Sequence, residues 1–355
     1  PGVEPLLAAK RRVEAFGMRL THIERKLPHH EIVHGFDGAD QQTEAIKSLL
    51  HHMAEAGLEV LCYNWMPSED WCRTTAHNIE RAGSLTTAFD VGAPRTTVTD
   101  ADGAPPHTTP AKQLWENLER FLEQVLPLAE QLGLKLALHP DDPPLESFWG
   151  QDQIITNVDA LERVTNLSPS PANGVCFCSG SLGPAGGDLV EGVKRLGRKI
   201  HFAHLRNTRG TAECFEETWH DNGELDLPGV VKALHEIGYA GSIRPDHAPS
   251  MLGEPNDTPG YEMKGRLFAA GYLLRHLDDN GRFDYVRRST VSEKKYNLLR
   301  HAGAIHSLVQ YHAKTETPEV RDAIIRAARH LRERYVGPLP KHPGLLAAIS
   351  RPGEE

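Results

Sequence analysis

The fold is decided by the stretch Gly133-Leu134-Lys135-Leu136-Ala137-Leu138-His139, in which a glycine precedes a short apolar run. Residues 111–132, just before it, place apolar side chains on one face with the period of an amphipathic helix. Glycine after a helix supplies the left-handed backbone that closes the last turn. The stretch therefore predicts a helix that ends at Gly133 and leads directly into a buried strand.

The same helix–strand unit recurs along the chain. Further helices are predicted at residues 5–16, 42–56, 155–166, 188–196, 228–237 and 262–277, and strands at 18–23, 58–63, 134–139, 174–178, 200–204 and 241–245. Strands that alternate with helices are typical of a parallel sheet with helices packed on it. The fold class predicted is α/β.

Within that class we predict a TIM (β/α)8-type barrel over residues 1–281. Only six strands are visible and the chain opens on a helix, so the first strand is expected to be missing upstream; the eighth is not placed. An open doubly wound sheet would also fit six strands. No Gly-x-Gly-x-x-Gly follows the early strands, however, so dinucleotide binding has no support.

Two segments differ in character from the repeated units. Residues 84–110 are rich in Thr, Pro, Gly and Ala and are predicted to form a long loop over the site. After the breaker cluster at 278–281, residues 282–355 are predicted to form a helical extension, with helices at 292–313 and 318–335 and an irregular, proline-containing end. The domain boundary is therefore expected near residue 281.

Composition excludes several classes of partner. The 355 residues carry a net charge of -9 with interspersed charges, and 39% are apolar without a run long enough to span a membrane. Neither a nucleic acid nor a membrane is expected as a partner, whereas a small molecule is. Five scattered cysteines do not resemble a disulfide framework and favour a reducing compartment, hence the cytoplasm.

Reactive side chains in a parallel barrel lie where the strands end. Those positions hold Asn64, His139, Cys178, His204 and Asp246. Two imidazoles, a thiolate and a carboxylate suit Mn, Fe, Co or Zn better than Mg or Ca. Strand alternation places Cys176 on the same face as Cys178 but one layer deeper, as a core thiol, and Arg244 on the face of Asp246.

Each of these residues also has a structural interpretation. A single histidine at a strand end is more often a hydrogen-bonded structural residue, and a single buried cysteine is usually part of the core. The chain contains 20 histidines, which weakens any argument from one of them. The recurrence of such residues at successive strand ends is what favours a metal site.

Several motifs resemble the mannonate dehydratase family over about residues 5–277. They are Tyr63-Asn64-Trp65-Met66-Pro67, Asp70-Trp71-Cys72-Arg73-Thr74, His139-Pro140-Asp141-Asp142-Pro143-Pro144, Ala172-Asn173-Gly174 running to Cys178-Ser179-Gly180-Ser181, His204-Leu205-Arg206, Arg244-Pro245-Asp246-His247, Pro259-Gly260-Tyr261 and Gly265-Arg266-Leu267. The run from His139 to Pro144 is the most specific of them.

The resemblance implies a barrel of the xylose-isomerase type, a Mn²⁺ or Fe²⁺ ion, and dehydration of D-mannonate to 2-dehydro-3-deoxy-D-gluconate in glucuronate catabolism. It implies four metal ligands, a proton-transfer pair and a set of substrate-binding residues. The ligands would be His139, Cys178, His204 and Asp246; the pair His247 and Tyr261; the substrate-binding residues Asn64, Arg206, His220 and Arg244. For Arg73 and Arg266 a surface salt bridge is the preferred interpretation.

The chain departs from the family pattern after His247, where Ala248-Pro249 stands. Two other functions therefore stay open: a related metal-dependent isomerase or epimerase of a sugar or uronate, and an inactive barrel that supports the tail as an interaction module. The tail, Tyr296–Ile305 and Pro318–Ala323, weakly resembles a helical hairpin of α/α-toroid proteins. A homodimer is also left open.

Overall fold

The chain divides into two compact units, Pro1–Leu277 and Asp278–Glu355. The computed structural model describes residues 2–25, 27–67, 71–93 and 107–277 of the first unit. Of the second it describes residues 287–288, 291–292, 318, 321–322, 324–326, 328–329, 336–339 and 342–348. Asp70, part of one motif quoted above, lies outside the described residues.

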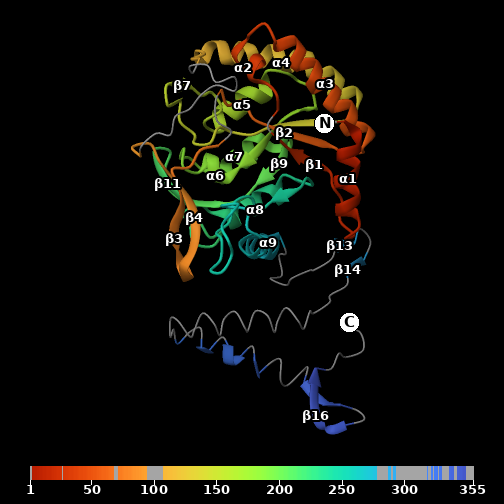
Figure 1. The fold of residues 1–355 in the computed structure, drawn as a ribbon, viewed down its shortest axis with the longest axis vertical. Coiled ribbons are helices and arrows are strands. Elements are labelled where there is room, and N and C mark those ends of the chain that lie inside the picture. The colour runs from red at the N-terminus through yellow and green to blue at the C-terminus, as the bar shows by residue number, and fades with distance from the viewer. Residues whose placement is uncertain are drawn as a thin grey trace. The chain divides into compact units, whose positions relative to one another are not determined.

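A six-stranded parallel sheet runs through the first unit (Figure 1). Its strands are, in spatial order, β1 (His22–Glu24), β2 (Val60–Tyr63), β5 (Lys135–Leu138), β8 (Asn173–Cys178), β9 (Ile200–His204) and β12 (Ile243–Arg244). Every neighbouring pair is parallel. All six predicted strands are thus confirmed, and the spatial order follows the sequence order.

Helices connect and cover these strands. They are α1 (Val3–Glu14), α2 (His30–His34), α3 (Ala39–Glu55), α4 (Ala111–Gln131), α5 (Val158–Asn166), α6 (Ser179–Leu182), α7 (Leu189–Leu196), α8 (Leu227–Glu236) and α9 (Met263–Leu277), with 3₁₀ turns η1 (Arg81–Gly83) and η2 (Gly197–Lys199). α4 buries Leu114, Leu118 and Phe121 on its predicted face. Gly57 and Gly133 end α3 and α4 with φ of +67° and +70°, as their position predicts.

The sheet curls around a small interior. Val60, Cys62, Ala137, Cys176 and Phe202 form a buried cluster of their own inside it, separate from the larger core between sheet and helices. The two edge strands approach one another through side chains: Ser242 Oγ lies 3.2 Å from Nδ1 of His22, and Arg244 pairs with Glu24.

The predicted α/β class is confirmed, and the barrel is only partly formed. Among the described residues the parallel sheet has six strands rather than eight, and β1 and β12 each pair with one neighbour. The sheet is therefore a curled part of a barrel.

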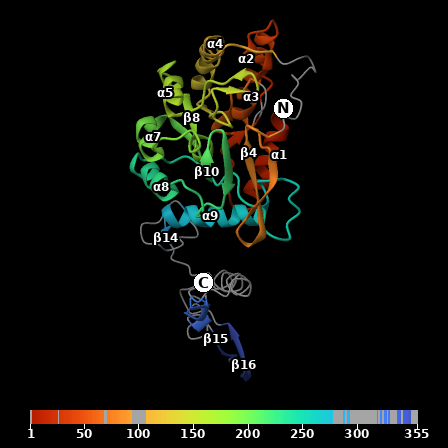
Figure 2. The same cartoon turned by 90° about the vertical axis from the view of Figure 1, so that its left-hand side faces the viewer.

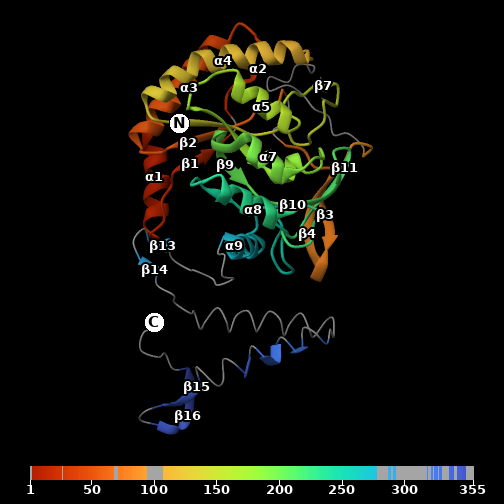
Figure 3. The ribbon, with the colours of Figure 1, turned by 180° about the vertical axis from the view of Figure 1, so that it is seen from behind.

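A second, antiparallel sheet was not predicted. It contains β10 (Asn207–Thr211), β11 (Cys214–Thr218), β4 (Ser84–Asp90) and β3 (Thr75–Glu80), in that order. Figure 3 shows these strands grouped on the side of the unit opposite α1, and in Figure 2 β4 and β10 face the viewer. The short pair β6 (Ser147–Phe148) and β7 (Gln151–Asp152) is separate.

The prediction of a continuous loop over residues 84–110 was therefore wrong at its start, where β4 lies. Residues 94–106 lie outside the described part. β4 pairs with the nearby β3 on one side and, on the other, with β11, 124 or more residues away in the chain, and neither partner strand was predicted from the sequence.

The second unit contains short antiparallel pairs. β13 (Arg287–Arg288) pairs with β14 (Val291–Ser292), and β15 (Val336–Leu339) with β16 (His342–Ala348). The described residues between 318 and 329 are helical, inside the second predicted helix, whereas the helix predicted at 292–313 lies almost entirely outside the described residues. The end predicted to be irregular contains β15 and β16, so that prediction was wrong for those segments.

Within the described residues, no helix is long and apolar enough to cross a membrane.

Candidate active site

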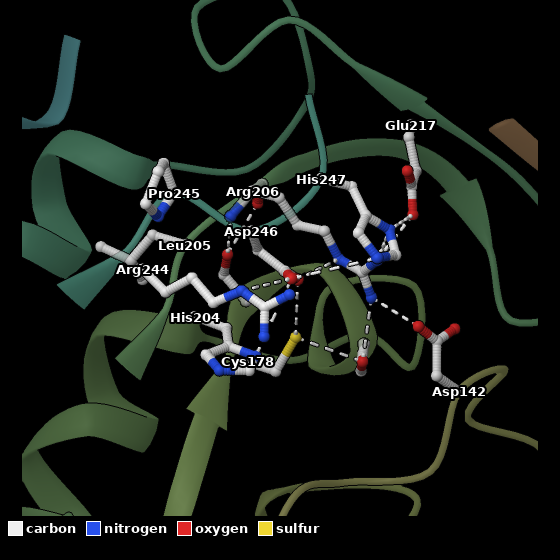
Figure 4. Close-up of polar contacts among 12 residues, drawn as sticks. Asp142, Cys178, His204, Leu205, Arg206, Glu217, Arg244, Pro245, Asp246 and His247 are labelled. Atoms are coloured by element: carbon white, nitrogen blue, oxygen red, sulfur yellow. Dashed lines mark hydrogen bonds and ion pairs between the residues drawn. The ribbon is translucent and has the colours of Figure 1, made fainter. Parts of the chain in front are cut away.

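The carboxyl ends of the parallel strands surround a cavity of about 450 Å³, a size typical of small-ligand sites. Most of the predicted site residues line it: Asn64, His139, His204, Arg206, Arg244, Asp246, His247 and Tyr261. These residues are far apart in the sequence and come together because parallel strands end at one edge of a sheet. Figure 4 shows several of them converging.

A cluster of metal-donor side chains includes His139, His204 and Asp246 of the cavity wall, together with Cys178, which does not line the cavity. The ligand atoms of His139, Cys178 and His204 all lie within 4.8 Å of one another. The carboxylate of Asp246 joins them, with Oδ2 3.8 Å from Cys178 Sγ and Oδ1 3.9 Å from His204 Nδ1. Ser181 Oγ lies 3.3 Å from the same sulfur and donates a hydrogen bond to it.

One observation in particular indicates that the donor cluster could hold a divalent ion. His204 is 1% exposed, yet neither of its ring nitrogens has a hydrogen-bond partner. A buried polar group without a partner costs stability, so such a group indicates a ligand that completes it. The set of two imidazoles, a thiolate and a carboxylate could hold Mn²⁺, Fe²⁺, Co²⁺ or Zn²⁺.

Asp246 is held in a sparsely populated backbone conformation, with φ of +38°. Burial disfavours its charged form, but the facing charges of His247 and Arg206 outweigh that cost and lower the pKa of Asp246 well below its usual range. Arg206 Nε lies 3.2 Å from Oδ2. The carboxylate is therefore charged and held in place at neutral pH.

His247 and Tyr261 form a hydrogen-bonded pair on the cavity wall. Nε2 of His247 lies 2.7 Å from the Tyr261 hydroxyl, and Nδ1 lies 2.7 Å from Oε1 of Glu217. Nδ1 also lies 2.5 Å from Nη1 of Arg206. A guanidinium only donates and a carboxylate only accepts, so these two neighbours favour opposite hydrogen-bonding roles for Nδ1. Burial raises the pKa of Tyr261 to about 12. The arrangement gives one imidazole and one phenol a shared proton path.

Glu217, on β11, is the site residue that the sequence analysis missed most completely. Its side chain accepts hydrogen bonds from Arg73, Arg206 and Thr87 at 2.5, 2.6 and 2.7 Å, and Oε1 lies 2.7 Å from Nδ1 of His247. Burial disfavours its charged form, but the charge of His247, followed by those of the two arginines, lowers its pKa well below the usual range. Glu217 is an anion that orients His247.

Arg206 is tied to protein carboxylates. Its side chain is 1% exposed; Nη1 donates to Glu217, and Nη2 donates to Asp142 at 2.5 Å. Gly180 is required beside it, since a Cβ at that position would lie 2.0 Å from Arg206 Nε. Arg73, with a side chain 4% exposed, donates to the same two carboxylates. Arg73 is thus part of a buried ion-pair network and not of a surface salt bridge.

The other predicted substrate-binding residues differ in position. Arg244 and Asn64 line the cavity; Arg244 stands over the Tyr261 ring, 5.4 Å from its centroid, and Asn64 accepts from Met66 N at 3.2 Å. His220 does not line it. His220 is fully buried, and its Nε2 bonds to the carbonyl oxygens of Leu205 and Pro245 at 2.7 and 3.0 Å. It braces the strand ends next to His204 and Asp246.

Asp142 and Glu217 could have been found by different signals. Asp142 belongs to the motif His139–Pro144, which the sequence analysis quoted without giving its aspartates a role. Cys214–Thr218 carries the aromatic and β-branched residues of a short strand, but nothing local shows that Glu217 meets His247. The Ala248-Pro249 departure is packed rather than loose: Ala248 N donates to Gly260 O, and the next residue, Ser250, pairs with Leu85 of β4.

Comparison with known proteins identifies the family of this chain. The chain matches the sequence model of the family D-mannonate dehydratase (UxuA) over residues 2–104 and 107–281. A mannonate dehydratase of Thermotoga petrophila is 37% identical over 305 residues, covering 77% of this chain and 84% of the relative. Mannonate dehydratase 2 of Halalkalibacterium halodurans is 34% identical over 295 residues, covering 76% and 85%.

Solved structures give the same result. The crystal structure of mannonate dehydratase from Streptococcus suis serotype 2 superposes with a TM-score of 0.74 at 33% identity, covering 83% of this chain and 88% of that one. A structure of L-ribulose 3-epimerase, at 13% identity and a TM-score of 0.51, shares the fold alone. The chain belongs to the D-mannonate dehydratase family.

Proposed function

We propose that this protein is a mannonate dehydratase, which converts D-mannonate to 2-dehydro-3-deoxy-D-gluconate and water. Family membership supports the reaction. The observation that carries it is that the His247–Tyr261 pair lines the same cavity as His139, His204 and Asp246, three of the four donors.

The reaction removes a proton from C2, next to the carboxylate, and the hydroxyl from C3. The C2–H electron pair forms the C2=C3 double bond, the C3–O bond breaks, and the departing oxygen takes a proton and leaves as water. The enol that results tautomerises to the 2-keto acid. The site must therefore supply a base, an acid and stabilisation of negative charge on the carboxylate.

His247 and Tyr261 supply the proton transfers in this proposal. The Glu217 carboxylate lies 2.7 Å from Nδ1 of His247 and stabilises the imidazolium that forms when the ring takes up a proton. Tyr261, whose pKa burial raises to about 12, keeps its proton at neutral pH and can donate it. The 2.7 Å contact between Nε2 and the hydroxyl allows the proton to pass between the two groups.

The cofactor proposed is Mn²⁺ or Fe²⁺, held by His139, Cys178, His204 and Asp246. Such an ion supplies Lewis-acid stabilisation of an enediolate. Arg244 is the better placed of the two predicted carboxylate-binding arginines, since its side chain is 22% exposed, whereas that of Arg206 is 1% exposed. Asn64, on the cavity wall, is proposed to bind a substrate hydroxyl.

The direct test is conversion by the purified, Mn²⁺-loaded chain. D-mannonate should yield a 2-keto-3-deoxy acid, and a panel of sugar acids and keto sugars tests the isomerase and epimerase alternatives. Absence of product from D-mannonate with metal bound would refute the proposal. We also propose a cytoplasmic setting, supported by five free cysteines, three of them buried. The homodimer stays a prediction, to be measured by light scattering.

A further inference from the structure

A pair of thiols lies directly beneath the donor cluster, inside the curled sheet. Cys62 on β2 and Cys176 on β8 are both fully buried and belong to the interior cluster. Their sulfurs and a ring nitrogen of His204 all lie within 4.8 Å of one another. From its place in the strand, Cys176 is expected to be a core thiol, and the proposed dehydration uses neither thiol.

The two nitrogens of His204 face two different groups. On one side, Nδ1 lies 3.9 Å from Asp246, which in turn lies 3.8 Å from Cys178. On the other side, Nε2 lies 3.8 Å from Glu24 Oε2, while Cys62 Sγ lies 3.8 Å from Glu24 Oε1. Both nitrogens lack a hydrogen-bond partner in a side chain that is 1% exposed. One imidazole thus stands between two sets of donors.

A disulfide does not account for the thiol pair. β5 lies between β2 and β8 in the sheet. Two strand spacings of about 4.8 Å separate the backbones by roughly 9–10 Å, well beyond the roughly 4.4–6.8 Å between Cα atoms that a disulfide spans. Thiolates bound to one tetrahedral ion at about 2.3 Å each need only lie about 3.8 Å apart, which suits side chains that point at one another from alternate strands.

We propose that Cys62, Cys176 and His204 form a second metal site, for a thiophilic divalent ion such as Zn²⁺ or Cd²⁺, with Glu24 beside it as a fourth donor. Soft thiolates select such ions over Mn²⁺. A neutral imidazole offers one lone pair, so an ion on Nε2 places the proton on Nδ1. His204 is then no longer available to bind an ion together with His139, Cys178 and Asp246. The thiol site is therefore an inhibitory site, because it competes with the donor cluster for His204.

Binding is tested without reference to activity. The full chain, stripped of metal and kept reduced, is titrated with Cd²⁺, and thiolate-to-cadmium charge-transfer absorbance is followed in the near ultraviolet. Wild type should show absorbance from more than one thiolate. Cys62→Ala and Cys176→Ala should each remove a large share of it and weaken binding by about 10-fold or more, as even outer partners of a ligand do. Cys178→Ala should retain the larger share.

The exposed Cys214 provides the matched control, and Cys214→Ala should change nothing. The proposal is overturned if the absorbance survives in both Cys62→Ala and Cys176→Ala, or if it disappears with Cys178→Ala alone, which means that Cd²⁺ binds the donor cluster instead. Dependence on Cys214 would also overturn it and would mean an adventitious ion only. The two single variants are independent, so one that fails to fold, as judged by circular dichroism, leaves the other as the test.

Competition is the second readout, and it alone rests on the proposed function. Cd²⁺ should inhibit the Mn²⁺-loaded wild type, and Cys62→Ala should require about 10-fold more Cd²⁺ for the same inhibition. Equal inhibition of both proteins contradicts competition for His204. If the protein is inactive on D-mannonate, the proposed function fails while the absorbance titration still decides the site.

Discussion

The two sheets of the first unit differ in whether a buried polar side chain at the site has hydrogen-bond partners. At the ends of the parallel strands, both ring nitrogens of His204 have no hydrogen-bond partner. On the antiparallel sheet, the Glu217 carboxylate lies within hydrogen-bond distance of four side chains. Unpaired buried donors indicate that a ligand completes the cluster, whereas a fully paired anion indicates a fixed scaffold. Substitutions at the two sheets should therefore have different effects.

The largest loss of activity is expected at His204, whose ring nitrogens have no hydrogen-bond partner in the protein. His204→Ala, or removal of metal with a chelator, should lower kcat by at least about 10³-fold, because Lewis-acid stabilisation contributes several kcal/mol. Bound metal per chain, measured by elemental analysis, should fall in parallel. Readdition of Mn²⁺ should restore the chelated wild type but not the variant. Full activity without metal would show that the cluster is structural.

His247 follows the parallel strand β12 and contacts Glu217 of the antiparallel sheet. Its substitution should therefore cause the next largest fall in kcat. His247→Asn should lower kcat by about 10²–10³-fold, within the range that acid–base groups contribute. Metal content should not change. Tyr261→Phe is the companion variant, since it removes only the hydroxyl 2.7 Å from Nε2. Wild-type rates in both variants would place proton transfer elsewhere.

Loss of the ion pairs between Glu217 and the two arginines should lower the free energy of unfolding as well as kcat. Glu217→Gln keeps the shape but leaves Arg73 and Arg206 with one anion fewer, and breaking a buried pair costs about 3 kcal/mol or more. Urea unfolding measures this cost. Asp221→Asn is the matched control, because its pair with Arg81 is about one-third exposed and such pairs contribute about 0–1 kcal/mol. If the two variants unfold at similar urea concentrations, the buried ion pairs of Glu217 do not contribute the expected stability.

The smallest effect concerns His201, below the site on β9. Burial lowers its pKa to about 4 from the usual 6.5. The unfolded chain therefore takes up a proton near pH 6.5 and the folded chain does not, so stability should fall as pH drops from 6.5 towards 4. The loss should reach about 2 kcal/mol after allowance for partial exposure. His201→Gln should flatten this slope in urea melts, whereas His77→Gln, at an exposed position, should not.

The parallel sheet could be predicted because its information is local. The helix–glycine–strand unit at Gly133 and its repeats specify six strands, and strand ends are neighbours in any parallel sheet. The same rule predicts that His139, Cys178, His204 and Asp246 lie together. His247 and Tyr261 came from resemblance to a family, since nothing in their spacing shows that they touch.

What the sequence by itself determined is the α/β class, the parallel strands and the donors at their ends, because helical and strand periods are properties of short segments. Only the tertiary structure decided that β4 and β11 pair across 124 or more residues. It alone brought Glu217 to His247, enclosed Arg206 among carboxylates and turned His220 from the cavity. Those contacts join segments with no local signal in common, so burial and charge pairing in the folded chain select them.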